Sequence, residues 1–485
     1  MQYYLKALLK YGILNALSLV FLACSATLPD SKSLTNSLQS EFNNTSLISL
    51  NNSNAKKLTT NPKEQIELLF LDSNLNALFD LALSKNLDLQ IAQARILQAQ
   101  SQLKSAWSSL FPQINSTLNT STNHTRTNTT PTLKTHTNNT QIGATLSWEL
   151  DLFGRLRHTK NAKESLYQKS IQDLENAKIT LFADIATLYF TLLETQQNLI
   201  LTKENITHYQ EALELTRLKV ENGLLDSTEL FEKQDLLTQE QNTLETLKSL
   251  EVESKNALLI LLDLNLDSNL LPFKISQTLP TPKIYFNLTN LPADTLLSRP
   301  DIKASLLSLH AQIYTKVNAK ASLFPIISIS ANINEILDSS TQASGNLVWW
   351  LASSLSAPIL NRTQLTQNYF LQDALLKESY LTLQKSLKNA FFEIENASFN
   401  VKSAHTQLQN SQKRLENAQN YYNFSLNRHS IGLIDLREHS LNSASLNNAK
   451  KSLNTAHSEN LKTLISLYKA FGGNLNLQKD FNANP

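Results

Sequence analysis

Cysteine is almost absent from this chain of 485 residues, which has only Cys24, so no disulfide can form within it. Glycine and proline are also scarce, with 8 and 12 copies. Because both residues interrupt helices, their scarcity favours long continuous helices over a turn-rich β-sandwich. Charge of one sign is lacking too, since 43 Lys and Arg nearly balance 41 Asp and Glu. A net charge of +2 gives no general electrostatic basis for binding nucleic acid.

Residues that carry chemistry are not gathered into any motif. The 9 histidines are scattered, and His429 and His439 are ten positions apart, which does not place them on one helix face. No His–Cys cluster has zinc-ligand spacing, and no glycine-rich phosphate-binding loop occurs. The sequence therefore predicts no catalytic, cofactor-binding or metal-binding residues, and a protein that is not an enzyme.

The N-terminal region predicts export. Lys6 and Lys10 precede an apolar run that is too short to span a membrane and that ends in Phe-Leu-Ala before Cys24. These four residues resemble a bacterial lipobox, which implies a signal peptide over residues 1–23 and covalent diacylglycerol and palmitate on Cys24. A plain signal peptide followed by a chance cysteine is the alternative. The polar residues 24–71 are predicted to form a flexible tether.

An internal repeat organises the remainder of the chain. Asn-Leu-Asp-Leu at 86–89 leads to Ser-Leu-Phe-Pro at 109–112, and Arg-Pro-Asp-Ile at 299–302 leads to Ser-Leu-Phe-Pro at 322–325 with identical spacing. Gly-Leu-Leu-Asp beginning at Gly223 and Gly-Leu-Ile-Asp beginning at Gly432 follow in the same order. A shift of roughly 210 residues superposes the two halves.

Each half is predicted to contain a pair of strands. Apolar residues occupy alternate positions from 142 to 152, which is typical of a strand with one apolar face. Residues 121–139 are so polar that we expect an exposed loop there. Aromatic residues in these segments are candidates for the membrane interface: Trp148, Trp349 and Trp350. The predicted strands span about 113–126, 140–152, 326–336 and 346–360.

Very long helices are predicted after each strand pair. Residues 155–222 and 361–431 contain neither Gly nor Pro, and each stretch would be about 100 Å long as a helix. Partner helices are predicted over 227–263 and 435–470. Apolar residues at spacings of three and four predict coiled-coil packing. Gly223 and Gly432 are expected to form the turns of the two helical hairpins.

Three sequence elements carry a resemblance to a known family. They are Ser-Trp-Glu-Leu-Asp-Leu-Phe-Gly-Arg at 147–155, Leu-Leu-Ser-Arg-Pro-Asp-Ile at 296–302 and Leu-Tyr-Lys-Ala-Phe-Gly-Gly at 467–473. They resemble the TolC/OprM-like outer-membrane efflux proteins, in the lipoprotein branch that serves RND-type multidrug efflux systems. The resemblance implies a first repeat over 72–290, a second over 291–473 and a C-terminal tail over 474–485.

The resemblance also implies a fold class and an assembly. The chain would be mainly α with a transmembrane β-barrel, and three copies with four strands each would close a twelve-stranded barrel above an α-helical periplasmic tunnel. The expected partners are two further copies of the chain, a periplasmic adaptor (membrane fusion) protein, an inner-membrane RND-type pump and outer-membrane lipid, with no nucleic acid. An equatorial region would include residues 258–291 and the tail.

The function that this resemblance implies is passive conduction of drugs or other small toxic compounds across the periplasm and outer membrane. The protein would be anchored by lipid in the outer membrane and extend into the periplasm. One alternative is the same architecture serving as an exit duct for type I protein secretion. An alternative of another class is a periplasmic coiled-coil adaptor lipoprotein, although an adaptor would not repeat a strand pair and helices twice.

The gate of such a channel is expected at the hairpin that turns at Gly432. Four residues near it are candidates: Asp435, Arg437, Glu438 and Leu441. Leu441 could form an apolar constriction, while the two acids could pair with Arg437 and hold the closed state. The alternative for Asp435 and Glu438 is ordinary capping of a solvated helix N-terminus.

Overall fold

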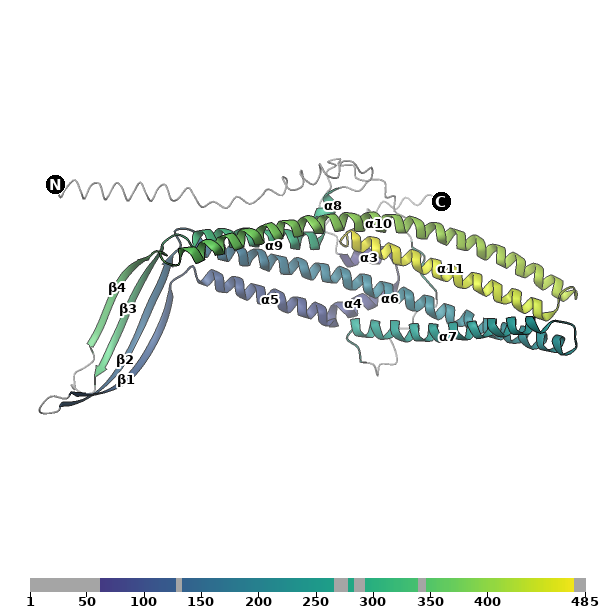
Figure 1. Cartoon of the computed structure of the whole chain (residues 1–485), viewed down its shortest axis with the longest axis horizontal. Helices are drawn as coiled ribbons and strands as arrows, with labels where there is room; N and C mark the ends of the chain where they lie inside the picture. The colour runs from purple at the N-terminus through teal and green to yellow at the C-terminus, as the bar shows by residue number, and fades with distance from the viewer. Residues whose placement is uncertain (1–61, 128–132, 266–277, 283–292, 339–345, 475–485) are drawn as a thin grey trace. The chain divides into compact units, whose positions relative to one another are not determined.

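The computed structural model describes residues 62–127, 133–265, 278–282, 293–338 and 346–474. The helices and strands occur in two similar successions (Figure 1). In chain order they are α3 (Pro62–Phe70), α4 (Ser73–Lys85), α5 (Leu87–Ser108), β1 (Gln113–Thr127), β2 (Leu133–Leu150), α6 (Arg155–Glu221), α7 (Ser227–Leu261), α8 (Ala293–Ser298), α9 (Pro300–Ala321), β3 (Ile326–Asp338), β4 (Asn346–Ser356), α10 (Arg362–Ser430) and α11 (Leu436–Ala470).

Contacts divide the described residues into two compact units. The first comprises Ala94–Ile171 and Ala304–Lys385, and the second comprises residues 62–93, 172–303 and 386–474. Across the described parts of both units, we find no helix whose length and apolar character would allow it to cross a membrane.

The first unit contains one antiparallel sheet, in which the strands lie in the order β1-β2-β3-β4 (Figure 1). The register places apolar residues opposite one another on one face. One row across the sheet is Ile114, Leu146, Ala331 and Leu351, and another is Ser116, Ala144, Ile333 and Trp349. The alternate residues form a polar face, with rows such as Gln113, Ser147, Ser330 and Ala352. The sheet therefore has one mainly apolar and one mainly polar surface, and Trp350, which was predicted to lie at the membrane interface, pairs with Asn332 on the mainly polar one.

The first strand pair is longer than the sequence indicates. The prediction of an exposed loop over residues 121–139 is wrong, because β1 continues to Thr127 and β2 begins at Leu133. Facing residues in this part pair through the backbone, as Ser121 does with Asn139. Polarity did not preclude strands here, since the threonines in this segment are β-branched and favour an extended backbone.

Two other predicted strands end earlier than expected. The first, predicted to reach residue 152, ends at Leu150, because the Asp151 carboxylate accepts hydrogen bonds from the Leu156 and Arg157 amides at 3.0 and 2.9 Å. Asp151 thereby begins α6 rather than extending β2. The strand predicted over 346–360 ends at Ser356, shortly before Pro358, which cannot donate to a sheet.

The junction between strands and helices in the first unit is tied by aromatic and polar contacts. The Phe153 and Phe324 rings stack with their centroids 4.9 Å apart. Asn318 donates hydrogen bonds of 2.7 Å to the Arg155 carbonyl and to the Thr159 hydroxyl. The guanidinium of Arg155 in turn forms an ion pair of 2.7 Å with Glu149 on β2. These contacts fix the direction in which the long helix leaves the sheet.

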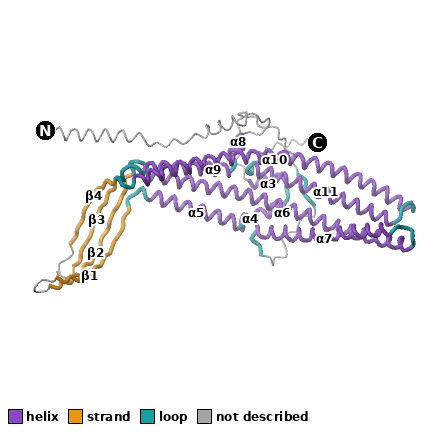
Figure 2. The backbone as a smooth tube through the Cα atoms, viewed as in Figure 1, coloured by secondary structure: helices purple, strands orange, loops and turns teal. Residues whose placement is uncertain are grey.

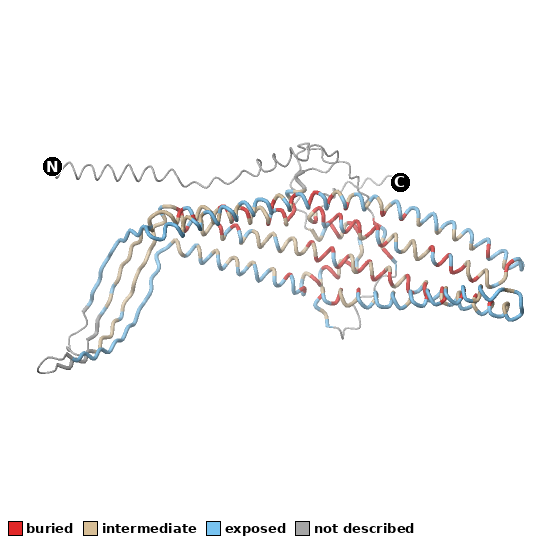
Figure 3. Tube along the Cα trace, viewed as in Figure 1, coloured by how far each residue is buried: buried red, intermediate tan, exposed pale blue. Residues whose placement is uncertain are grey.

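The core of the second unit lies where the short helices pack on α6, α7 and α11, and buried residues concentrate there (Figure 3). Edge-to-face contacts join Phe70 to Phe190 and Phe79 to Phe182, with centroids 4.9 and 5.0 Å apart. Such pairs add stability beyond the burial of apolar area. This core fixes the base from which the long helices extend.

The end of the predicted tether belongs to this core. Residues 24–71 were expected to be flexible, but Pro62–Phe70 forms α3, whose Ile66 and Leu69 are fully buried. The Tyr468 hydroxyl donates a 2.9 Å hydrogen bond to the Pro62 carbonyl. The prediction was wrong here because the 66, 69, 70 spacing of apolar residues is helical but too short to stand out in a polar segment. Cys24 and the signal region lie outside the described residues.

Candidate functional site

Two hairpin turns in the second unit form the candidate site, one joining α6 to α7 and the other joining α10 to α11 (Figure 2). In the first, the Leu224 amide donates to the Lys219 carbonyl at 2.8 Å, and in the second, the Leu433 amide donates to the Arg428 carbonyl at 2.8 Å. Gly223 and Gly432 have φ values of 70° and 75°. Both helices therefore end in the same glycine-dependent Schellman turn.

The helix that follows each turn begins at an aspartate. Asp226 caps α7 by accepting from the Thr228 amide at 2.7 Å, and Asp435 caps α11 by accepting from the Glu438 amide at 2.8 Å. Burial alone would raise the pKa of Asp435, but hydrogen bonds from Lys219 and from the Glu438 amide outweigh it and lower the pKa. Asp435 therefore remains charged well into the acid range.

Two ion pairs join the second hairpin to the first. The Lys219 ammonium on α6 contacts the Asp435 carboxylate, and the Arg437 guanidinium on α11 contacts the Glu229 carboxylate on α7 at 2.8 Å. Arg437 also lies 3.9 Å from Asp435 through Nε. We call these four residues the crossed ion pairs. Each is partly exposed, so each pair contributes modestly, typically about 0.2–1 kcal/mol.

The structure brings some of the gate candidates together and not others. Asp435 and Arg437 both belong to the crossed ion pairs, whereas the described contact of Glu438 is its backbone amide. Leu441 is half-buried on α11. Sequence reasoning missed Lys219 and Glu229. The repeat held a signal for Glu229, because it follows its turn as Glu438 follows the other.

Above the turns, α6 and α11 meet mainly through polar side chains. Ser440 donates to Glu211 at 2.8 Å and Asn447 donates to Glu204 at 3.1 Å. Further pairs between the same two helices are Asn205–Asn448, Asn454–Asn198 and Lys462–Glu194, while Lys451–Glu240 joins α11 to α7. Water can replace such contacts more readily than it can enter an apolar seam. This seam is suited to a joint that opens and closes.

The remaining predicted site residues lie elsewhere. Trp148 donates from its indole N–H to the Leu110 carbonyl at 3.1 Å, and Trp349 and Trp350 on β4 are 72% and 44% exposed. In the ranges that the structure describes, no group of three or more His, Cys, Asp or Glu could hold a metal ion. The arrangement thus offers a polar, charge-paired joint at the hairpin ends.

The chain contains two successions, each with a strand pair followed by a long helical hairpin, and the two strand pairs form one sheet. This arrangement defines a two-repeat membrane-channel architecture. The chain belongs to the outer membrane efflux protein family, which it matches over residues 78–262 and 291–473. The two matched ranges correspond to the two structural repeats.

Relatives of established name agree with this assignment. The chain is 25% identical to toxin and drug export protein A of Aggregatibacter actinomycetemcomitans, over 85% of this chain and 89% of that protein. It is 26% identical to the solvent efflux pump outer membrane protein SrpC of Pseudomonas putida, over 83% and 86%. The crystal structure of the Campylobacter jejuni CmeC outer membrane channel is similar with a TM-score of 0.73, 25% identity and coverage of 88% and 91%.

The fold class and the function predicted from the sequence are therefore confirmed. The protein is an outer-membrane channel of a tripartite efflux system, and it extends into the periplasm.

Proposed function

We propose that three copies of this chain form a continuous duct that passively conducts small toxic compounds from a periplasmic adaptor and an inner-membrane RND-type pump to the exterior. The observation that carries this proposal is the sheet, whose two faces differ in polarity. The apolar residues Leu347, Trp349 and Leu351 are 64%, 72% and 69% exposed in the single chain. Such a surface suits lipid on one side, while the polar face suits an aqueous interior on the other.

The sheet edges support assembly of several copies. Among the described strands, β1 and β4 are at the two ends of the sheet. A strand at an edge presents backbone donors and acceptors that another chain can satisfy. Pairing of β4 in one copy with β1 in the next joins the sheets around a common polar interior. In a closed assembly of three copies, we expect the hairpin ends to surround one periplasmic opening.

The lipid anchor and the absence of catalysis are further parts of the proposal. Diacylglycerol and palmitate on Cys24 would hold the N-terminus of the mature chain at the membrane, and about two acyl chains suffice for stable anchoring. Conduction through a duct needs a lumen, a closed wall and a gate, and it needs no nucleophile or cofactor. The crossed ion pairs supply contacts that a gate can exchange.

The names of relatives support a proposal about the cargo. SrpC is a solvent efflux pump protein, which favours small apolar compounds as cargo here. A second candidate is toxin export, because the similar protein of A. actinomycetemcomitans is named for both toxin and drug export. Profiling a deletion strain for sensitivity to solvents, dyes, bile salts and antibiotics, and for loss of secreted toxins, separates the two.

A direct experiment tests the duct. The protein purified from outer membranes should migrate as a heat-modifiable trimer and should raise the conductance of planar lipid bilayers. Labelling with radioactive palmitate should be lost in Cys24→Ser. A monomer, or a protein that salt washes from the membrane, would contradict the proposal and favour an adaptor.

A further inference from the structure

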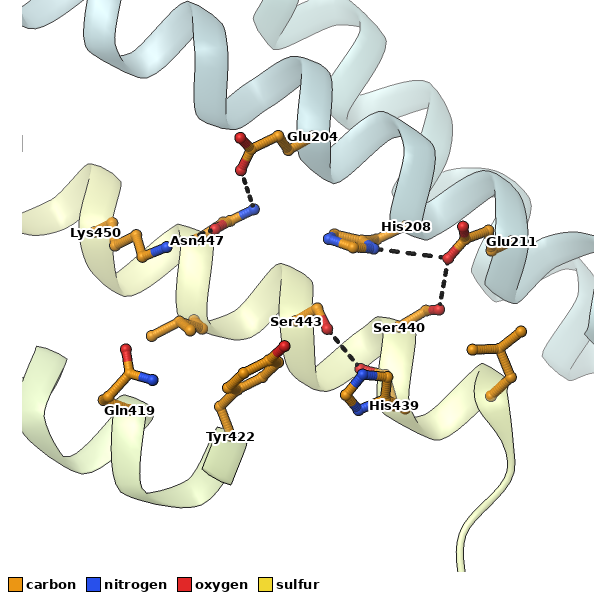
Figure 4. A pocket seen from close by; sticks show the side chains of 12 residues that line it. Glu204, His208, Glu211, Gln419, Tyr422, His439, Ser440, Ser443, Asn447 and Lys450 are labelled. Atoms are coloured by element: carbon orange, nitrogen blue, oxygen red, sulfur yellow. Dashed lines mark hydrogen bonds and ion pairs between the residues drawn. The ribbon is translucent and has the colours of Figure 1, made fainter. Parts of the chain in front are cut away.

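A cavity of about 460 Å³ lies between the two hairpins, and its lining side chains are drawn in Figure 4. One of them, His439, is two positions along α11 from Arg437 of the crossed ion pairs. It is formed by α6, α10 and α11. Its polar lining includes two histidines and two carboxylates: His208, Glu211 and Glu204 from α6 and His439 from α11. The described contacts of the crossed ion pairs do not include any of these side chains.

A third histidine lies against this group. The His429 ring on α10 stacks on the His439 ring with centroids 5.0 Å apart and planes inclined by 4°. The turn at Gly432 brings the two rings together although they are ten positions apart in the sequence. His429 Nδ1 lies 3.2 Å from the Ile434 carbonyl, so this nitrogen carries the hydrogen that is donated. The Tyr422 ring lies 5.6 Å from His439 on another side.

The Nδ1 atoms of His439 and His208 are buried at the cavity, and neither has a hydrogen-bond partner among the described residues. His208 Nδ1 is 3.7 Å from a Glu211 carboxylate oxygen, and that oxygen accepts a hydrogen bond of 2.8 Å from Ser440. Because no described side chain accepts a hydrogen bond from His439 Nδ1, a charged His439 ring would lack that stabilisation in this arrangement.

The charges that face His439 come from three helices. From α6 it faces His208 and Glu211, with Glu204 further along the cavity, and from α10 it faces His429 and the phenol of Tyr422. Lys450 of its own helix also lines the cavity. Burial first, then His429 and His208, lower the pKa of His439, while Glu211 raises it. The closed arrangement therefore favours the neutral ring.

We propose that His439 takes up a proton as the pH falls below neutral and thereby loosens the contact between the two hairpins. The His439 ring lies at the cavity between α6 and α11 and stacks on the His429 ring. A charge on this ring is unfavourable in such a packed and partly buried setting. Separation of α11 from α6 exposes the charged ring to solvent, so protonation favours the looser contact.

The sign of the pH effect follows from the lowered pKa of His439. Above the ordinary histidine value of 6.5, the ring is neutral in both the closed and the loosened arrangements. As the pH falls below that value, the loosened arrangement takes up a proton more readily, so the closed arrangement is progressively disfavoured. The lowered pKa of Asp435 keeps its pairs with Lys219 and Arg437 intact in the same range.

The test measures the distance between hairpins in the full-length protein. Spin labels are introduced as unnatural amino acids in place of Glu214 on α6 and Ser445 on α11, which are both exposed. Electron paramagnetic resonance then gives the separation at about pH 7.5 and about pH 5.5, on either side of the ordinary histidine pKa. We expect a longer or broader distance at the lower pH in the parent protein.

Variants assign the effect to His439. His439→Gln keeps a polar side chain that does not titrate, and it should abolish the change. The matched control is His405→Gln, which removes a histidine of α10 outside the cavity and should leave the change intact. An unchanged distance in the parent protein, or an equal change in His439→Gln, would overturn the proposal.

Recordings of channel current test the proton site separately from the proposed function, on which the physiological role of the site rests. In planar bilayers, acidification on the side of the hairpins should raise the current of the parent channel by about threefold or more, and should leave His439→Gln unchanged. A pH-dependent distance without any conductance at either pH would refute the duct while upholding the proton site. A pH-dependent current without a distance change would refute the proton site alone.

Discussion

Arg299 and Asn86 occupy corresponding places at the starts of the two repeats, and each holds the C-terminus of a hairpin helix. Asn86 donates to the Leu261 carbonyl at 2.8 Å, where α7 ends, and Arg299 donates to the Ala470 carbonyl at 2.6 Å, where α11 ends. These side chains satisfy carbonyls that a helix end leaves without intrahelical partners. The Arg-Pro-Asp element that carried the family resemblance thus has a structural purpose.

Arg299 is 6% exposed and bonds Asp301 and Glu393 as well as the carbonyl. We expect Arg299→Lys to lower the stability of the trimer by about 2–3 kcal/mol, because an ammonium cannot make the fork of bonds that a guanidinium makes. The measurement is the temperature at which the trimer dissociates on a gel. Arg428→Lys, at the exposed end of α10, is the control, and equal effects of the two changes would contradict this account.

The crossed ion pairs give a second prediction about single side chains. Arg437→Ala and Glu229→Gln should each raise the resting current through the closed channel, because each removes one contact between the hairpins. In the double variant, the closed state should lose less free energy than the sum of the two single losses. The difference should be about 1 kcal/mol or smaller, which is typical of a partly exposed pair. Strict additivity would show that the 2.8 Å contact does not hold the closed state.

Whole helices and strands show how far sequence reasoning extends. The Phe-Pro elements, the glycine turns and the alternation around Trp148 are local signals, and the strand pairs and long helices that they indicated are present. Longer strands in the first pair were missed because their polarity mimicked a loop. The helix α3 was missed because three buried residues are a short signal.

The placement of side chains across the hairpins could be predicted less well. Asp435 and Arg437 were identified from their positions near the Gly432 turn, where the family resemblance places a gate, but nothing local shows that Lys219 or Glu229 is their partner. His429 and His439 were set aside because of their spacing, whereas the turn between them makes their rings stack. Pairings of this kind depend on how two helices pack, and one sequence does not encode that packing in any local pattern.

Helix α3 provides a prediction about a single element. Ile66→Ala should destabilise the docking of α3 by about 2–5 kcal/mol, because Ile66 is fully buried in the core of the second unit. The exposed Glu64 on the same helix supplies the control, Glu64→Ala. Limited proteolysis should cut the isoleucine variant near residue 62 much faster than the control or the parent. Equal cleavage rates would show that α3 is not held by this side chain.

At the level of the assembled channel, we predict that the effect of an added charge depends on the face of the sheet where it lies. Leu351→Arg places a charge on the apolar face and should cost about 2–4 kcal/mol in a membrane, so less trimer should reach the outer membrane. The neighbouring Ala352→Arg places the same charge on the polar face and should be tolerated. Fractionation and immunoblotting of both variants measure this, and equal yields would contradict the assigned orientation of the sheet.

The apolar face of the sheet has a consequence for how cells make this protein. Four apolar side chains of this face are each about two-thirds exposed or more in the single chain: Ile114, Leu118, Trp349 and Leu355. An unassembled copy in the periplasm therefore exposes an apolar surface to water. Such a chain aggregates unless something shields it. We therefore expect its strands to complete their folding only on insertion, and the apolar face to need shielding until then.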